Sequence, residues 1–150
     1  MSATATDLLS PEDVFIDVAA PDKRRLLEVL SRRAAARLGL NEDNVVHEVL
    51  NREALGSTGV GKGVALPHAR LAELKRPFAM LARLRNSMEF EAIDGEPVDL
   101  VVLLLMPHDQ AAGHVSVLAS IARKLRSEDV RSRLRKAGAV TDLYEAFRRD

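Results

Sequence analysis

The segment VDLVVLLLM at residues 98–106 limits the choice of fold more than any other part of the chain. It consists almost entirely of β-branched residues and leucine, and Pro107 follows it at once. A strand this apolar is covered on both faces, because a strand with one wet face alternates polar and apolar side chains. Its apolar part, residues 100–106, is also far shorter than the roughly 18 residues of a membrane-spanning helix. We therefore expect helices on both sides of a buried sheet.

Helical patterns lie on both sides of this segment in the sequence. Before it, Asp22 is placed to cap a helix that Gly39 ends, and a second helix opens at Asn41 and runs out near Glu53. After it come three helical stretches, the last two capped at residues 127–129 and 141–142. Strands are expected at residues 64–66 and 78–84 and in the alternating residues 88–92. Helices first and last with strands between them predict a layered α/β domain.

Length, charge and composition narrow the class of protein. The 150 residues suffice for one domain, and we expect a polar tail at residues 1–13 followed by that domain at residues 14–150. The 22 basic residues equal the 22 acidic ones, so no overall field attracts nucleic acid or acidic lipid. Cysteine is absent, which excludes disulfides and thiol nucleophiles. Since the N-terminus lacks the pattern of a secretory signal, we expect a cytoplasmic protein.

The glycine-rich stretch GSTGVGKG at residues 56–63 is the most informative one for function. It nearly matches a nucleotide-binding P-loop, but Gly63 stands where a serine or threonine would ligate magnesium. A P-loop also follows a strand and opens a helix, whereas this stretch follows a predicted helix and leads into the apolar residues 64–66. Nucleotide binding is therefore not expected.

The same stretch suits an anion without a nucleotide. Glycines let consecutive backbone N–H groups converge on an anion, so the candidate phosphate-binding residues are Ser57, Thr58, Gly59 and Gly61. His68 lies just past them, and an imidazole with a pKa of about 6.5 is mostly neutral at pH 7. A neutral imidazole beside an oxyanion cradle suits reversible phosphoryl transfer to nitrogen. His68 is the predicted phosphoryl acceptor.

Other chemistries fit the sequence less well. His108 and His114 do not have helical i, i+4 spacing and no third ligand lies nearby, so we predict no metal site and no cofactor. Ser57 lacks the nucleophile-elbow motif of a hydrolase. Arg52 lies near the end of the second predicted helix, and one interpretation of it is purely structural, as a cation that stabilises the helix C-terminus. The basic stretch at residues 123–136 is interpreted as a solvated helical face rather than a surface for nucleic acid.

Several strings of residues together resemble the IIA component of the bacterial phosphotransferase system, of the fructose/mannitol class and its nitrogen-regulatory branch. They are NRE at residues 51–53, GSTGVG at 56–61, GVALPH at 63–68, FEAID at 90–94, PVDL at 97–100 and GH at 113–114. The likeness runs from about residue 14 to residue 147. It implies a mixed sheet of about five strands flanked by helices on both faces, and a phosphohistidine formed without a metal.

The resemblance also implies roles and partners. His68 accepts a phosphoryl group from a phosphohistidine carrier protein, Arg52 contacts that group, and His114 faces it as a second histidine. The partners it implies are regulatory targets such as potassium transport or sensor proteins, with no nucleic acid and no membrane insertion. Val115 and Lys62 depart from the family pattern outside the proposed chemistry. Two alternatives stay open: a sugar-specific IIA subunit that passes phosphate to a IIB domain, and an interaction module that is never phosphorylated.

Overall fold

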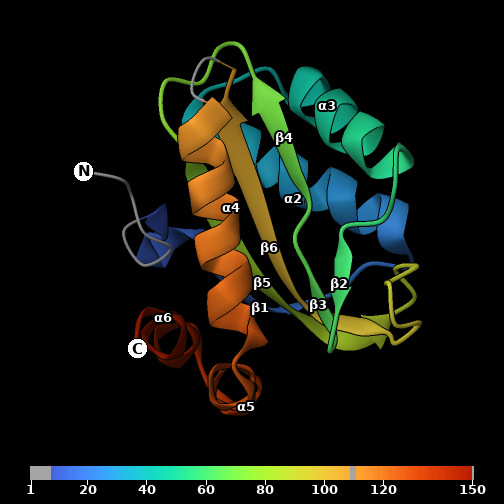
Figure 1. Ribbon diagram of the computed structural model, residues 1–150, viewed down its shortest axis with the longest axis vertical. Coiled ribbons are helices and arrows are strands. Elements are labelled where there is room, and N and C mark those ends of the chain that lie inside the picture. Colours follow the sequence, from blue (N-terminus) through green and yellow to red (C-terminus); the bar gives the residue numbers. More distant parts are fainter. Residues whose placement is uncertain (1–7, 109–110, 150) are drawn as a thin grey trace.

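A mixed sheet with helices on both faces forms the centre of the protein, as the sequence predicts (Figure 1). The computed structural model describes residues 8–108 and 111–149, and the side chains of residues 111–116 are not described. Within this part of the chain the sheet has six strands, one more than expected. Five follow in the order β1 (Val14–Val18), β5 (Phe78–Met88), β6 (Val98–Pro107), β3 (Val64–Ala65) and β2 (Gly59–Gly61), while β4 (His68–Leu71) also pairs with β6.

Each face of the sheet has its own hydrophobic core. The helices α2 (Lys23–Leu38) and α3 (Glu42–Ala54) cover one face, and α4 (Ala111–Arg126), α5 (Glu128–Lys136) and α6 (Val140–Arg148) cover the other (Figure 1). Along β6, Val101, Leu103 and Leu105 pack on the α2–α3 side, and their neighbours in the chain pack on the α4–α6 side. Successive side chains of a strand point to opposite faces. The unbroken apolar segment therefore serves both cores.

Caps set most of the helix ends where the sequence places them. The Asp22 carboxylate accepts the Arg25 N–H at 2.9 Å, and the Asn41 side-chain oxygen accepts the Asn44 N–H at 2.9 Å. Gly39 ends α2 with a left-handed φ of 71°, a conformation that costs glycine little. The expected cap at residues 141–142 is wrong, because α6 begins at Val140 and its N-cap residue makes no side-chain cap bond.

The strand expected at residues 88–92 is not formed beyond Met88. β5 continues from Phe78 to Met88, whereas residues 89–92 form no strand. Glu91 has a φ of 57°, which is incompatible with extended backbone. Phe90 and Ala92 are nevertheless buried. The alternation of apolar residues therefore reflects the burial of side chains from a connecting segment and not a strand.

The first part of the domain was not recognised in the sequence. β1 lies parallel to β5 at the edge of the sheet, and its end residues Val14 and Val18 are buried. Residues 8–13, assigned from the sequence to the polar tail, include a short 3-10 helix, Pro11–Asp13, and the buried Leu9 and Asp13. The Asp13 carboxylate accepts a 3.0 Å hydrogen bond from Nε of Arg37, which ties this segment to α2.

β3 and β4 are two pieces of one path along β6. Val64 lies opposite Leu100 and His68 lies opposite Leu104, so the parallel register is the same in both pieces. Pro67 has no N–H and interrupts the ladder, but its carbonyl still accepts the Leu104 N–H at 2.9 Å. His68 is therefore the first residue of a strand that is anchored to the most buried strand of the sheet.

Candidate functional site

The glycine-rich stretch folds as a hairpin. β2 and β3 are antiparallel, and Lys62 and Gly63 form the two-residue connection between them. Both have positive φ angles, 58° and 78°, as a two-residue hairpin turn of the primed type requires. The stretch is not a strand–loop–helix unit, so its geometry differs from that of a P-loop.

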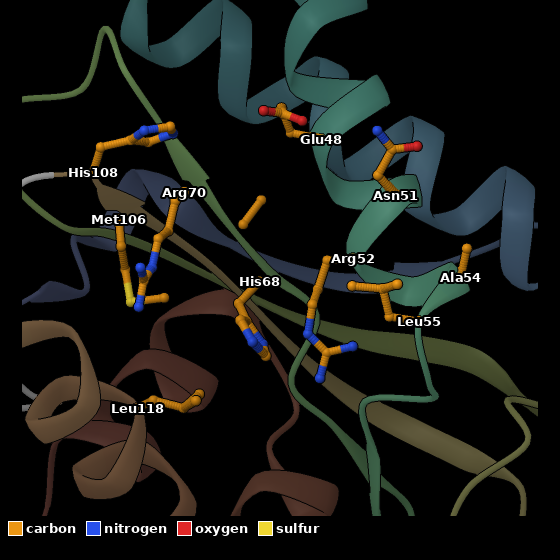
Figure 2. A pocket seen from close by; sticks show the side chains of 11 residues that line it. Glu48, Asn51, Arg52, Ala54, Leu55, His68, Arg70, Met106, His108 and Leu118 are labelled. Carbon is orange, nitrogen blue, oxygen red and sulfur yellow. The ribbon is translucent and has the colours of Figure 1, made fainter. Parts of the chain in front are cut away.

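A cavity of about 800 Å³ opens between α3, β4, the end of β6 and α4 (Figure 2). His68 and Arg70 of β4, Arg52 of α3 and His108 after β6 line it together. The remaining described lining residues are Glu48, Asn51, Ala54, Leu55, Ala69, Met106 and Leu118. Two of the residues singled out in the sequence, Arg52 and His68, thus meet at one site.

The ring of His68 is half-buried and its tautomer is defined by one hydrogen bond. Its Nδ1 lies 2.9 Å from the Leu66 carbonyl oxygen, and because a carbonyl can only accept, Nδ1 carries the hydrogen. In the neutral ring Nε2 then holds a free lone pair. Burial holds the pKa of His68 below its usual value, and the charges of Arg52 and Arg70 act in the same direction. The bond to Leu66 and the charge of Glu53 oppose this lowering of the pKa.

Two arginines flank His68. In Figure 2 the Arg52 side chain lies on one side of the imidazole and the Arg70 side chain on the other. Nη1 of Arg52 donates a 2.9 Å hydrogen bond to the Gly56 carbonyl, which holds the guanidinium beside the cavity. Sequence reasoning missed Arg70. The signal was its spacing from His68, because residues two apart in a strand share a face.

The four candidate phosphate-binding residues lie in the loop between α3 and β2 and in β2, and they are absent from the described lining of the cavity. The Ser57 hydroxyl donates to the Phe90 carbonyl at 2.8 Å, and the Thr58 hydroxyl donates to the Glu53 carboxylate at 2.6 Å. The Gly59 N–H donates to the Ser57 hydroxyl oxygen at 3.1 Å, while Gly61 ends β2. These groups hold the loop together in the structure.

Gly59 is required by the close approach of another chain segment. A Cβ at this position would lie 2.8 Å from both Cα and Cβ of Ala92, which is closer than carbon atoms tolerate. We expect Gly59→Ala to lower the free energy of unfolding by about 1–3 kcal/mol, the usual cost of overpacking. Urea titration of both proteins measures it. Gly138→Ala is the matched control, because its Cβ would meet nothing nearer than 3.8 Å, and an equal loss in that variant would contradict the steric explanation.

Other residues considered in the sequence take different places. The side chain of His114, in α4, lies outside the residues whose side chains are described, as does that of Val115. Lys62 lies at the hairpin turn, in a separate hollow with Arg135, and is absent from the described lining of the His68 cavity.

Among residues 8–108 and 117–149, no group of three or more His, Asp or Glu side chains is arranged to hold a metal ion. No helix in the described part of the chain has the length and apolar character needed to span a bilayer.

A histidine with one unprotonated ring nitrogen between two arginines, carried by a mixed α/β domain, suits a phosphotransferase component. Comparison with known families agrees with this class. The chain belongs to the family described as phosphoenolpyruvate-dependent sugar phosphotransferase system, EIIA 2, whose model matches residues 7–150. The resemblance drawn from the residue strings is thereby confirmed. Proteins of this family are phosphotransferase components that pass phosphate from and to other proteins of the system.

Individual relatives point to the nitrogen-regulatory branch. The chain is 42% identical over 142 residues to a nitrogen regulatory protein of Bradyrhizobium diazoefficiens, covering 95% of this chain and 93% of the relative. Its fold matches the crystal structure of the nitrogen regulatory protein IIA-Ntr from Neisseria meningitidis with a TM-score of 0.85 and 31% identity, over 95% and 97% of the two chains. The mannitol enzyme IIA of Escherichia coli, solved in complex with phosphorylated enzyme IIB, shares the fold (TM-score 0.76, 21% identity, 93% and 96% covered).

Proposed function

We propose that the protein is a cytoplasmic phosphocarrier of a nitrogen-type phosphotransferase system, which accepts a phosphoryl group on Nε2 of His68 from a phosphohistidine carrier protein. Its phosphorylation state regulates target proteins. The observation that carries the proposal is the hydrogen bond from Nδ1 of His68 to the Leu66 carbonyl, because it leaves Nε2 as the nucleophile beside two arginines. The similarity to nitrogen regulatory proteins supports the regulatory role.

The transfer follows from these positions. The Nε2 lone pair attacks phosphorus of the donor's phosphohistidine, the N–P bond to the donor ring breaks, and that ring keeps the electron pair. Arg52 and Arg70 balance the charge of the phosphoryl oxygens, for which the planar guanidinium fork is suited. His114 is proposed to face the phosphoryl group from α4. Ser57, Thr58, Gly59 and Gly61 contribute by shaping the loop whose Gly56 carbonyl holds Arg52.

Locating the modified atom tests this proposal. The purified protein is incubated with phosphoenolpyruvate and the general phosphotransferase proteins, and mass spectrometry then identifies the modified side chain. We expect one phosphoryl group on His68, lost on brief acid treatment because a phosphoramidate is acid-labile. Acid-stable label on Ser57 or Thr58 would overturn the proposed chemistry, and absence of label with an active donor would favour an interaction module.

A sugar-specific IIA subunit is the second candidate, favoured by the fold shared with a mannitol IIA protein whose structure includes phosphorylated IIB. In that case phosphorylated protein would pass its phosphoryl group to a IIB domain within seconds. A regulatory carrier would instead retain the label in the presence of IIB domains. Mixing the labelled protein with purified fructose- and mannitol-type IIB domains separates the two.

The titration of His68 should reflect its surroundings. Burial and the two arginines hold its pKa below the usual value of about 6.5, so Nε2 keeps its lone pair at pH values where a free histidine is already protonated. We expect the rate of phosphoryl acceptance to fall as the pH is lowered, with a midpoint below the pKa of about 6.5 of a free histidine. Ring ¹⁵N shifts of His68, followed by NMR from pH 8 to pH 5, measure the protonation directly. Half-protonation at or above pH 6.5 would contradict this expectation.

A further inference from the structure

A buried carboxylate lies beside the site and takes no part in the chemistry proposed so far. The side chain of Glu53, in the last turn of α3, is only 6% exposed. Its two oxygens accept the N–H of Thr58 at 2.8 Å and the hydroxyl of Thr58 at 2.6 Å. A carboxylate near a helix C-terminus is disfavoured by the helix dipole, and burial adds a desolvation cost. A buried carboxylate at this position therefore needs favourable interactions that offset both costs.

A lysine from α2 neutralises this carboxylate. Nζ of Lys23 lies 2.9 Å from Glu53 and also donates to the Phe90 carbonyl at 3.2 Å. Its charge lies 4.6 Å from the centroid of the Phe90 ring. Lys23 forms a second ion pair at 3.3 Å with Glu91, whose side chain is 78% exposed. The ammonium group is thus fixed from several sides, and it supplies the opposite charge that a buried carboxylate requires.

From Glu53 a continuous series of hydrogen bonds leads to the imidazole. Glu53 holds the N–H and hydroxyl of Thr58, and the Thr58 carbonyl accepts the Leu66 N–H at 2.9 Å. The Leu66 carbonyl in turn accepts the Nδ1–H of His68 at 2.9 Å. These bonds fix the positions of the loop at Thr58, the backbone at Leu66 and the imidazole relative to one another.

The same loop also holds Arg52. The Gly56 carbonyl that accepts from Arg52 lies between Glu53 and Thr58 in the chain, and the neighbouring Ser57 hydroxyl is bonded to the Phe90 carbonyl. The position of Glu53 therefore bears on both His68 and Arg52. It reaches the nucleophile through Thr58 and Leu66, and the arginine through the loop that the carboxylate closes.

We propose that Glu53 is a positioning residue, which acts through Thr58 and Leu66 to fix the Nδ1–H tautomer and the orientation of His68. The inference rests on the proposed role of His68 as phosphoryl acceptor. A carboxylate that orients a metal-bound histidine usually contacts the ring directly, and its loss typically lowers metal affinity or activity about tenfold to a hundredfold. Here two residues, Thr58 and Leu66, stand between the carboxylate and the ring.

A pair of substitutions at Thr58 tests the relay, by which we mean the series of hydrogen bonds from Glu53 through Thr58 and Leu66 to His68. Thr58→Val keeps the shape of the side chain and removes the donor to Glu53, whereas Thr58→Ser keeps the donor. We expect Thr58→Val to slow phosphoryl transfer to His68 about tenfold or more. The Nδ1–H of His68 should also exchange faster with water, and its ring ¹⁵N shifts should move toward a mixture of tautomers. Thr58→Ser should restore the rate and the shifts, a rescue that a purely structural role of the methyl group would not produce.

A second pair separates the buried carboxylate from the exposed one on the same lysine. Glu53→Gln removes the charge and one acceptor, so it should slow transfer and, since the Glu53 charge raises the pKa of His68, lower that pKa further. Glu91→Gln removes only the exposed partner of Lys23 and should leave both quantities unchanged. Equal rates and equal ring shifts in wild type, Thr58→Val and Glu53→Gln would overturn the inference.

The unmodified protein provides a test that does not depend on how a variant folds. In it the Nδ1–H of His68 and the hydroxyl proton of Thr58 should both be protected from exchange, and Nε2 should carry no hydrogen at neutral pH. A hydrogen on Nε2 would refute the relay. Failure of the proposed function looks different, because label would then be absent from His68 while the protected Nδ1–H remained.

Discussion

Replacement of His68 by alanine should abolish phosphoryl acceptance and leave the domain folded. The Nε2 lone pair is the nucleophile in the proposed transfer, and alanine offers none, so no slower route through the same atom exists. The ring is half-buried and makes one hydrogen bond through Nδ1, so its removal should leave both hydrophobic cores intact. Incorporation of phosphate from labelled phosphoenolpyruvate, compared with wild type in the presence of the general phosphotransferase proteins, measures the effect.

His47→Ala is the matched control for this experiment. His47 is exposed on α3, where its Nε2 accepts from the Asn51 amide at 3.0 Å, and it is absent from the lining of the cavity. The His47→Ala variant should incorporate phosphate at the wild-type rate. Label retained in the His68→Ala variant would show that another residue accepts the phosphoryl group. Circular dichroism and a thermal melt of both variants verify that loss of label is not loss of fold.

Arg52→Ala should slow phosphoryl transfer about 10²–10³-fold, equivalent to about 3–4 kcal/mol of transition-state stabilisation, by analogy with the loss of one oxyanion donor. The reason is that the guanidinium lies beside His68 and is held toward the cavity by the Gly56 carbonyl. Its hydrogen bond is exposed, so the free energy of unfolding should change little. Rapid-quench measurement of a single transfer from a phosphorylated donor, together with urea titration, separates rate from stability.

Two further substitutions show which property of Arg52 matters. Arg52→Lys keeps the charge and loses the planar fork, so an intermediate rate is expected. Arg32→Ala removes an exposed arginine on α2 that pairs with Glu42 and Asp43 and is absent from the described lining of the cavity, so it should not affect transfer. If Arg52→Ala transferred phosphate at the rate of Arg32→Ala, Arg52 would be reduced to a cation at the end of a helix.

The fold could be predicted where local chemistry and burial agree. The apolar residues 98–106 indicated a strand with two covered faces, and Asp22, Gly39 and Asn41 marked the helix ends that the structure has. β1 was missed because its five residues, VFIDV, do not alternate cleanly and its pairing with β5 is a long-range contact. The alternation at residues 88–92 was misleading, since burial there comes from a bent connecting segment and not from a strand.

The site was predicted in outline, from residues whose chemistry is visible in the sequence. Arg52 and His68 were singled out, and the structure brings them together. Sequence reasoning did not foresee the Leu66 acceptor, Arg70 or the hydrogen bonds of Glu53, because they depend on how the loop folds back on α3 and on which face of β4 is exposed. The hydroxyls of Ser57 and Thr58 could equally have faced outward, and only the three-dimensional structure shows that they bond to Phe90 and Glu53.

The common register of β3 and β4 along β6 has a consequence for how two proteins would exchange a phosphoryl group. Because the proposed acceptor, His68, is carried by a strand that pairs with the central strand β6, its backbone has little conformational entropy to lose when a partner arrives. On the side of this protein the encounter is therefore close to rigid docking, and the donor has to approach with its phosphorus in line with Nε2 of His68. The orientation of the imidazole is therefore set when the chain folds, before any partner binds.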